Sequence, residues 1–324
     1  MKIPQNKKIL LAPLAGVSDV AFRIISQKYG ADGAYTEMIS IKGLYYNDEK
    51  TEKLGYIDKC EKNTNIQIFG SDPEIFEKVI KEKLNPRDDI KEININMGCP
   101  APKITKNKEG SFLLTQPNLV KKILKTCVKS SNKKVTLKYR MGFEKNNLNY
   151  IEIGKIAQDA GISSLTLHAR SRNQFYEGKA DWSAIKKLKE SVQIPVYANG
   201  DIFTVNDFIK CMEYTNADGC MIARGAMGNP FIFKQIKDYL NTGFFEETSF
   251  SNIIREIKNQ YEISLKYKPE RIVINQMRKH VSWYLKGLNG SSKIKNIINN
   301  LKSLDEIYKV LDSYEKYLER NVND

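Results

Sequence analysis

The stretch EININMGCPAPK, Glu92–Lys103, predicts a buried strand that turns abruptly into a stiff loop. Isoleucine alternates with asparagine over residues 92–97, as in a strand with one apolar face, and Gly98 then breaks the pattern. Pro100 fixes its own φ and disfavours helix at the residue before it, which is Cys99. The thiol is therefore expected on a rigid corner at the carboxyl end of the strand.

The same unit, a short apolar run followed by a segment of helical length, recurs along the first 243 residues. Capping residues and prolines mark expected helix starts at 18–19, 72–73, 116–117, 181 and 204. The eight candidate strands are Ile9–Ala12, Gly33–Thr36, Asn65–Phe69, Ile93–Met97, Val135–Tyr139, Ser164–Leu167, Val196–Ala198 and Cys220–Ala223.

Alternation of strand and helix predicts a parallel sheet, and eight repeats with no strand left over favour a (β/α)8 TIM barrel. A doubly wound open sheet is the alternative, but no G-x-G-x-x-G follows the first strand. After Gly243 the strands stop, and the rest of the chain shows helical periodicity broken at Pro269 and at Asn289–Ser292. We therefore predict a barrel over residues 1–243 and a small all-helical domain over residues 244–324.

The chain has 324 residues, of which 41% are hydrophobic, and it carries a formal net charge of +14. This hydrophobic content is normal for a folded domain, and no apolar run approaches the roughly 18 residues that a membrane span needs. The five cysteines are scattered without a C-x-x-C pair, which indicates a reduced cytoplasmic protein without a thiolate zinc site. We expect no membrane association, no metal and a monomeric protein.

Positive charge gathers in two regions of the chain. Residues 101–145 hold twelve Lys or Arg against two acidic residues, and residues 251–303 hold eleven against three. Such an excess favours an acidic partner, for example nucleic acid. A lysine-rich composition throughout the chain is the other explanation, so charge alone does not decide between them.

Polar residues gather at the carboxyl ends of the predicted strands, where barrel enzymes place their active sites. Glycine-containing turns after the seventh and eighth strands offer backbone N–H groups to a phosphate, and Arg224 adds charge. Lys138 is unusual at a strand end, because lysine is rarely buried without a partner, and it can stabilise negative charge on a bound ring. The full set is Pro13, Leu14, Ala15, Gln67, Asn96, Cys99, Lys138, Arg140, His168, Arg170, Asn199, Gly200, Asp201 and Arg224.

Each of these residues also has a purely structural explanation. Cys99 can pack as a small apolar residue, and His168 can be a hydrogen-bonded core histidine. Lys138 and Arg140 can form ion pairs at the barrel mouth. Their common placement at one end of successive strands favours a shared site, because independent coincidences would rarely produce it.

The chain resembles the tRNA-dihydrouridine synthases, a family of FMN-dependent enzymes that reduce uridines in tRNA. The likeness covers nearly the whole chain, and the cysteine of NMGCP, the strand LKYR and the turn NGDI together distinguish this family from most other flavin barrels. The matching segments, in order, are LAPLAGVSDVAFR, YTEMIS, QIFGSDPE, INMGCPAPK, VTLKYRMGF, LTLHARSR, VYANGDI, MIARGAMGNPFIF and RKHVSWYLKG.

The resemblance implies a role for each matching residue. Cys99 corresponds to the family's catalytic cysteine, and Asn96 to a position near the flavin and the target base. Relatives usually have glycine where this chain has Ala223, so a tight turn with a positive φ would be strained there. Tightly but non-covalently bound FMN is expected to contact Pro13, Leu14, Ala15, Gln67, Lys138 and His168, with its phosphate end at Asn199, Gly200, Asp201, Ala223 and Arg224.

The same resemblance implies a reaction. NADPH, or NADH, reduces FMN, the flavin delivers a hydride to C6 of uracil, and Cys99 protonates C5. Lys138 would stabilise the anionic reduced flavin. The uridine must leave the folded RNA to reach the barrel mouth. We expect the tRNA to contact Asn96, Arg140, Arg170, Arg278 and Lys279.

Two other functions are consistent with parts of the sequence. A small-molecule FMN barrel, such as a dihydropyrimidine or dihydroorotate dehydrogenase, explains the flavin residues but not the basic helical region. A tRNA-binding protein that keeps the barrel as a scaffold has no need of Cys99, Lys138 and His168.

Overall fold

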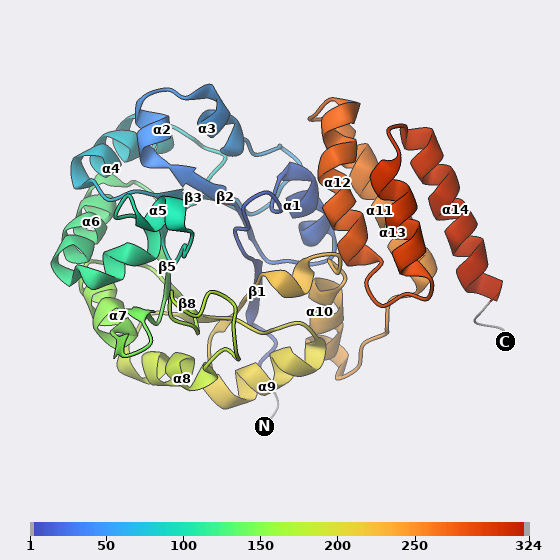
Figure 1. Cartoon of the computed structure of the whole chain (residues 1–324). Helices are drawn as coiled ribbons and strands as arrows, with labels where there is room; N and C mark the ends of the chain where they lie inside the picture. Colours follow the sequence, from blue (N-terminus) through green and yellow to red (C-terminus); the bar gives the residue numbers. More distant parts are fainter. Residues whose placement is uncertain (1–2, 321–324) are drawn as a thin grey trace.

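The computed structural model of the chain describes residues 3–320, and its eight predicted strands form one parallel sheet (Figure 1). The strands are β1 (Lys8–Leu11), β2 (Ala34–Ser40), β3 (Thr64–Phe69), β4 (Glu92–Met97), β5 (Lys134–Arg140), β8 (Leu165–His168), β9 (Val196–Asn199) and β10 (Gly219–Ile222). Their order in the sheet is β1-β10-β9-β8-β5-β4-β3-β2.

The two ends of this sheet meet, because β1 also lies beside β2. The N–H of Leu11 donates to the carbonyl of Gly33 at 2.9 Å, and the N–H of Asp32 donates to the carbonyl of Ile9 at 2.8 Å. The sheet is therefore closed, and the predicted TIM barrel with helices around it is confirmed.

The helices around the barrel are α1 (Val20–Lys28), α4 (Pro73–Val79), α6 (Pro117–Ser130), α7 (Tyr150–Asp159), α8 (Trp182–Ser191), α9 (Val205–Thr215) and α10 (Ile232–Thr242). They begin where capping chemistry predicts. The side chains of Asp19, Asp72 and Asp181 accept backbone N–H groups at the starts of α1, α4 and α8. Thr204 forms a capping box at α9, and Pro117 opens α6.

Several short elements were not predicted, because runs of two to six residues are too short to show a period. Strand β2 also extends from its predicted end at Thr36 to Ser40, and β10 ends at Ile222, just before Ala223. The additional elements are α2 (Ile41–Tyr45), α3 (Glu49–Leu54), α5 (Pro102–Thr105), the hairpin of β6 (Gly142–Glu144) and β7 (Asn147–Leu148), the π-helical turn η1 (Ile80–Leu84) and the 3-10 helices η2 (Gly110–Thr115) and η3 (Arg224–Ala226).

The chain beyond the barrel is helical, as predicted. It forms α11 (Phe250–Leu265), α12 (Glu270–Tyr284), α13 (Ser291–Asn300) and α14 (Leu304–Arg320), which stand together beside α1 in Figure 1. The predicted breaks are present, since Pro269 precedes α12 and Gly290 precedes α13. These helices share a hydrophobic cluster that is distinct from the barrel's main cluster. On this basis we propose residues 1–243 and 244–324 as the two domains.

The helical region packs tightly on the barrel. His280 is buried in α12 and lies between the ring of Phe22, with centroids 5.7 Å apart, and the ring of Trp283 at 5.2 Å. Gly228 lies directly against the backbone of α12, because a Cβ there would come within 2.3 Å of the carbonyl carbon of Trp283. Within residues 3–320, none of the helices is both long enough and apolar enough to span a membrane.

Candidate active site at the barrel mouth

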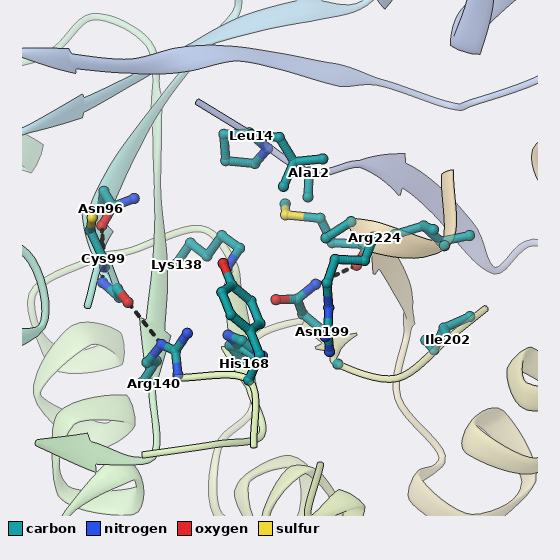
Figure 2. Close-up of a pocket in the computed structure, with 18 of the residues that line it drawn as sticks. Ala12, Leu14, Asn96, Cys99, Lys138, Arg140, His168, Asn199, Ile202 and Arg224 are labelled. Carbon is teal, nitrogen blue, oxygen red and sulfur yellow. Dashed lines mark hydrogen bonds between the residues drawn. The ribbon is translucent and has the colours of Figure 1, made fainter. Parts of the chain in front are cut away.

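A cavity that is partly open to solvent lies at the carboxyl ends of the barrel strands. Figure 2 shows its arrangement: Asn96 and Cys99 lie on one side, Asn199 and Arg224 on the other, and Lys138 and His168 between them. The predicted residues that line this cavity are Pro13, Leu14, Ala15, Gln67, Asn96, Cys99, Lys138, Arg140, His168, Asn199, Gly200, Asp201, Ala223 and Arg224.

The corner that carries Cys99 is held by hydrogen bonds from both directions. The Oδ1 atom of Asn96 accepts the N–H groups of Gly98 and Cys99, each at 3.0 Å. The carbonyl of Cys99 accepts the N–H of Ser111 at 3.1 Å and its hydroxyl at 2.8 Å. Burial raises the pKa of the Cys99 thiol, although an N–H from Ala101 and the nearby cations oppose this. Cys99 is thus a protonated thiol at neutral pH.

A chain of buried polar side chains inside the barrel orients Asn96. Asn96 Nδ2 donates to Gln67 Oε1 at 2.9 Å, Gln67 Nε2 donates to Asn94 at 2.6 Å, and Asn94 donates to Thr136 at 2.8 Å. The Thr136 hydroxyl donates to the carboxylate of Glu92 at 2.8 Å. A carboxylate only accepts, and backbone N–H groups only donate, so the two ends of the chain require the same orientation of every amide.

Lys138 places an amine without a partner in the cavity. Among residues 3–320 its amine has no hydrogen-bond or ion-pair partner. Burial first, and then repulsion from Arg140, lower the pKa of Lys138 to about 7, against a smaller opposing effect of Cys99. An anion bound beside this amine would relieve both costs, so the lysine favours a ligand that carries or develops negative charge.

His168 and Arg140 stand next to this lysine. Burial, followed by repulsion from Arg140 and the other cations, holds the pKa of His168 well below its ordinary value, so the imidazole is neutral. Arg140 connects two loops, because its Nε donates to the carbonyl of Gly98 at 3.0 Å and its Nη1 to those of Ser171 and Phe175 at 2.8 Å. Burial lowers the pKa of Arg140 to about 10, which leaves it cationic.

The opposite side of the cavity is built from charged groups. Asp201 accepts from Arg170 Nη2 at 2.7 Å and from Arg224 Nη2 at 3.0 Å. Burial alone would raise the pKa of Asp201, but the hydrogen bonds from Arg170 and from the N–H of Ala180 outweigh it and lower the pKa. Arg170 lies behind the cavity with 1% of its surface exposed, so it supports Asp201 and does not line the mouth.

In the turns on this side, neighbouring segments of the protein come so close to the backbone that two positions require glycine. Gly200 has φ +124°, and a Cβ there would lie 2.9 Å from the Cβ of Ala180 and 3.3 Å from the ring of His168. Ala223 has φ −110°, so the strain that a positive φ would cause at this alanine does not arise. The position in this turn that requires glycine is Gly225, because a Cβ there would lie 2.1 Å from the carbonyl oxygen of Ile202.

Sequence reasoning missed aromatic residues at the mouth. Tyr176 is 50% exposed, and its ring lies beneath Arg224 at 4.6 Å, near Arg140 at 5.7 Å and beside His168 at 6.2 Å. Phe203 flanks Arg224 at 5.3 Å. These residues lie in loops without periodicity, and their only signal is an aromatic residue among cations, as in SRNQFYEG.

The two predicted residues of α12 lie apart from the cavity. Arg278 Nη2 donates to the carbonyl of Leu301 at 3.3 Å, and the side chain lines a separate hollow with Arg271 and Lys302. Lys279 donates to the carbonyl of Gly16 in the barrel. In the described part of the chain no three His, Cys, Asp or Glu side chains gather as a metal site would require.

Comparison with known proteins gives a consistent result. A family model described as dihydrouridine synthase (Dus) matches residues 10–322. A protein named tRNA-dihydrouridine synthase B from Pasteurella multocida is 37% identical and covers 95% of this chain and 93% of its own length. A protein of the same name from Shewanella oneidensis is 36% identical and covers 98% of both chains. A solved structure of a FabK mutant from Thermotoga maritima covers 68% of this chain and 62% of its own, at 12% identity and a TM-score of 0.41, which is too weak to support an argument. The match over residues 10–322 and these full-length relatives establish that the chain belongs to the dihydrouridine synthase family.

Proposed function

We propose that this protein is a tRNA-dihydrouridine synthase that reduces specific tRNA uridines with FMN as its cofactor and NADPH, or NADH, as its reductant. The family and the names of the full-length relatives support the reaction class. The observation that carries the finer proposal is that a thiol, Cys99, and an unpaired lysine, Lys138, line the same cavity. We also propose that the enzyme is a monomer and that it works in the cytoplasm, where we expect it to meet tRNA.

The cavity has the features that a flavin mononucleotide needs. Its two sides differ in charge, since Arg170 and Arg224 against Asp201 leave one net positive charge at the β9–β10 end. The Nη1 atom of Arg170 is buried without a partner behind that end, and Arg224, which lines the cavity, keeps 33% of its side chain exposed. A phosphate fits that end. Lys138, toward the middle (Figure 2), and Gln67, on the Cys99 side, suit an electron-rich ring.

In this proposal each residue has a distinct part. When bound, the flavin supplies the hydride that C6 of the uracil ring receives. Cys99 Sγ gives its proton to C5, which is why a raised thiol pKa is useful. Lys138 stabilises negative charge in the cavity. Asn96 fixes the Cys99 corner through its bonds to Gly98 and Cys99, and Arg140 fixes it from the loop side.

The RNA has two basic surfaces available to it. One is the mouth itself, where Tyr176 is exposed among arginines and can stack with a base. The other is the hollow on α12, where Arg271, Arg278 and Lys302 come together and the Nε of Arg278 lacks a partner. The target uridine is flipped out of the folded RNA at a cost of a few kcal/mol.

The test uses the purified full-length protein. It should be yellow, should bleach when NADPH is added without oxygen, and should then form dihydrouridine in unmodified tRNA. A colourless protein that takes up no added FMN would refute the flavin assignment. A flavoprotein that bleaches with NADPH, leaves tRNA unchanged and reduces a free pyrimidine would refute the tRNA assignment.

A further inference from the structure

The loop between β1 and α1, residues 12–19, forms one wall of the mouth cavity. Its base is held from within: the carbonyl of Leu14 accepts the N–H groups of Val17 and Ser18 at 2.9 Å, and the Ser18 hydroxyl accepts the N–H of Leu14 at 2.9 Å. These bonds leave Gly16 at the tip of the loop, next to the cavity-lining Ala15.

The peptide groups of Gly16 are held by two charged side chains from other elements. The carboxylate of Glu37 in β2 accepts the N–H of Gly16, and the amine of Lys279 in α12 donates to its carbonyl. Each charge faces the end of the peptide dipole that it attracts. Gly16 has φ +70°, and a Cβ there would lie 3.1 Å from Lys279 Nζ, so glycine gives both the conformation and the space.

A second lysine from the helical region holds the other end of the same loop. Lys268 Nζ lies 2.6 Å from Asp19 Oδ2 and 2.7 Å from Gln276 Oε1. The other oxygen of Asp19 accepts the N–H of Phe22 and so caps α1. The helical region therefore contacts the loop at Gly16 and at Asp19, on both sides of Ser18.

The helix that carries Lys279 is itself immobilised on the barrel. His280 is buried against Phe22, and the backbone of α12 touches Gly228. Lys279 thus extends from a fixed base, and its neighbour Arg278 points to the carbonyl of Leu301 on the helical region itself. Two adjacent cations of one helix therefore serve different surfaces.

We propose that Lys279 is a positioning residue for the mouth cavity, fixing the β1–α1 loop through the carbonyl of Gly16, and that Glu37 is its counterpart on the N–H. The helical region then shapes the cofactor-binding wall as well as carrying RNA contacts. The consequence for the cofactor rests on the proposed function, whereas the ordering of the loop does not.

The experiment compares Lys279→Met, Lys279→Arg and the matched control Arg278→Met in the full-length protein. Hydrogen exchange of peptides covering residues 12–19 reports the loop without any cofactor. Lys279→Met should speed that exchange about three- to tenfold, because a charged hydrogen bond at a partly exposed position is lost. Lys279→Arg should restore slow exchange, and Arg278→Met should leave it unchanged. FMN binding to deflavinated protein should weaken by a similar factor in Lys279→Met alone.

Unchanged loop exchange in Lys279→Met would overturn the proposal, and lower tRNA affinity in that same variant would instead assign Lys279 to RNA. Equal acceleration in Arg278→Met would also overturn it, because the effect would then be general loosening of α12. If wild-type protein binds no FMN, the proposed function fails, and the exchange measurement still decides the role of Lys279. Glu37→Gln provides an independent variant, and it should loosen the same peptides.

Discussion

The two sides of the barrel mouth are built from different interactions. Around Cys99, neutral amides and hydroxyls hold the backbone together with one guanidinium group, that of Arg140, and the chain from Asn96 through Gln67 reaches a carboxylate only at Glu92. Around Arg224, ion pairs hold the structure: the carboxylate of Asp201 binds the guanidinium groups of Arg170 and Arg224. On the first side, burial favours the proton on sulfur although Arg140 and Lys138 oppose it, whereas a side that binds an anion needs fixed positive charge.

The largest effect should follow from Cys99→Ala, on the thiol side. Removing the proton donor should lower dihydrouridine formation by about 10²–10⁴-fold, while NADPH still bleaches the flavin at a near-normal rate. Single-turnover tRNA assays and anaerobic absorbance measure the two steps separately. Cys60→Ala is the control, because Cys60 is an exposed thiol outside the cavity. A variant at residue 99 that modifies tRNA at the wild-type rate would make Cys99 a packing residue.

Asp201→Asn should damage the charged side and leave the thiol side intact. Arg170 is buried, and losing its ionic partner while keeping a weaker amide contact should cost about 1–3 kcal/mol of unfolding free energy. Because the pKa of Asp201 is lowered in the folded protein, its contribution is present above the ordinary carboxylate pKa and is lost as pH falls below about 4. Urea unfolding at several pH values measures this. Asp238→Asn, which removes an exposed i,i+4 pair with Lys234, should change almost nothing.

A smaller and pH-dependent effect should come from Lys138, which lies between the two sides. Its pKa is about 7 in the folded protein, and a bound anion should raise it. FMN affinity should therefore fall as pH rises above about 7, by at most tenfold per pH unit. Lys138→Met should bind FMN more weakly and without this slope. A wild-type affinity that stays level from about pH 7 to about pH 9 would show that Lys138 does not meet the ligand's charge.

The smallest effect should come from Arg278→Ala, away from both sides of the mouth. Loss of one phosphate contact should weaken tRNA binding a few-fold and reduce the slope of log affinity against log salt by about 0.7–0.9. Filter binding across a salt series measures this, and reduction of the flavin by NADPH should be unaffected. An unchanged slope would remove the hollow at Arg271, Arg278 and Lys302 from the RNA-binding surface.

Sequence was most informative where a period or a cap was present. The strand ends, and hence Cys99, Lys138 and His168, were predictable because parallel strands bring their carboxyl ends to one rim. The helical periodicity after Gly243 and its breaks at Pro269 and Asn289–Ser292 likewise predicted the helical region. No period or cap in the sequence indicates which atom a long polar side chain will contact.

Three features of the molecule could therefore be found only in its structure. Arg170 supports Asp201 from behind the cavity, and Tyr176 stands between arginines in a loop without periodicity. Lys279 reaches Gly16, a residue 263 positions earlier, which no local pattern indicates.

That last contact has a consequence for the order in which the protein is made. Strand β1 pairs with β10, and Gly16 is held by Lys279, so the first strand and its loop wait for segments synthesised more than two hundred residues later. At about 5–20 residues per second, the interval is on the order of ten to fifty seconds. The wall of the cavity formed by the β1–α1 loop can be completed only after α12 has left the ribosome. A prematurely ended chain would thus carry Cys99 and most of the barrel and still lack a finished pocket.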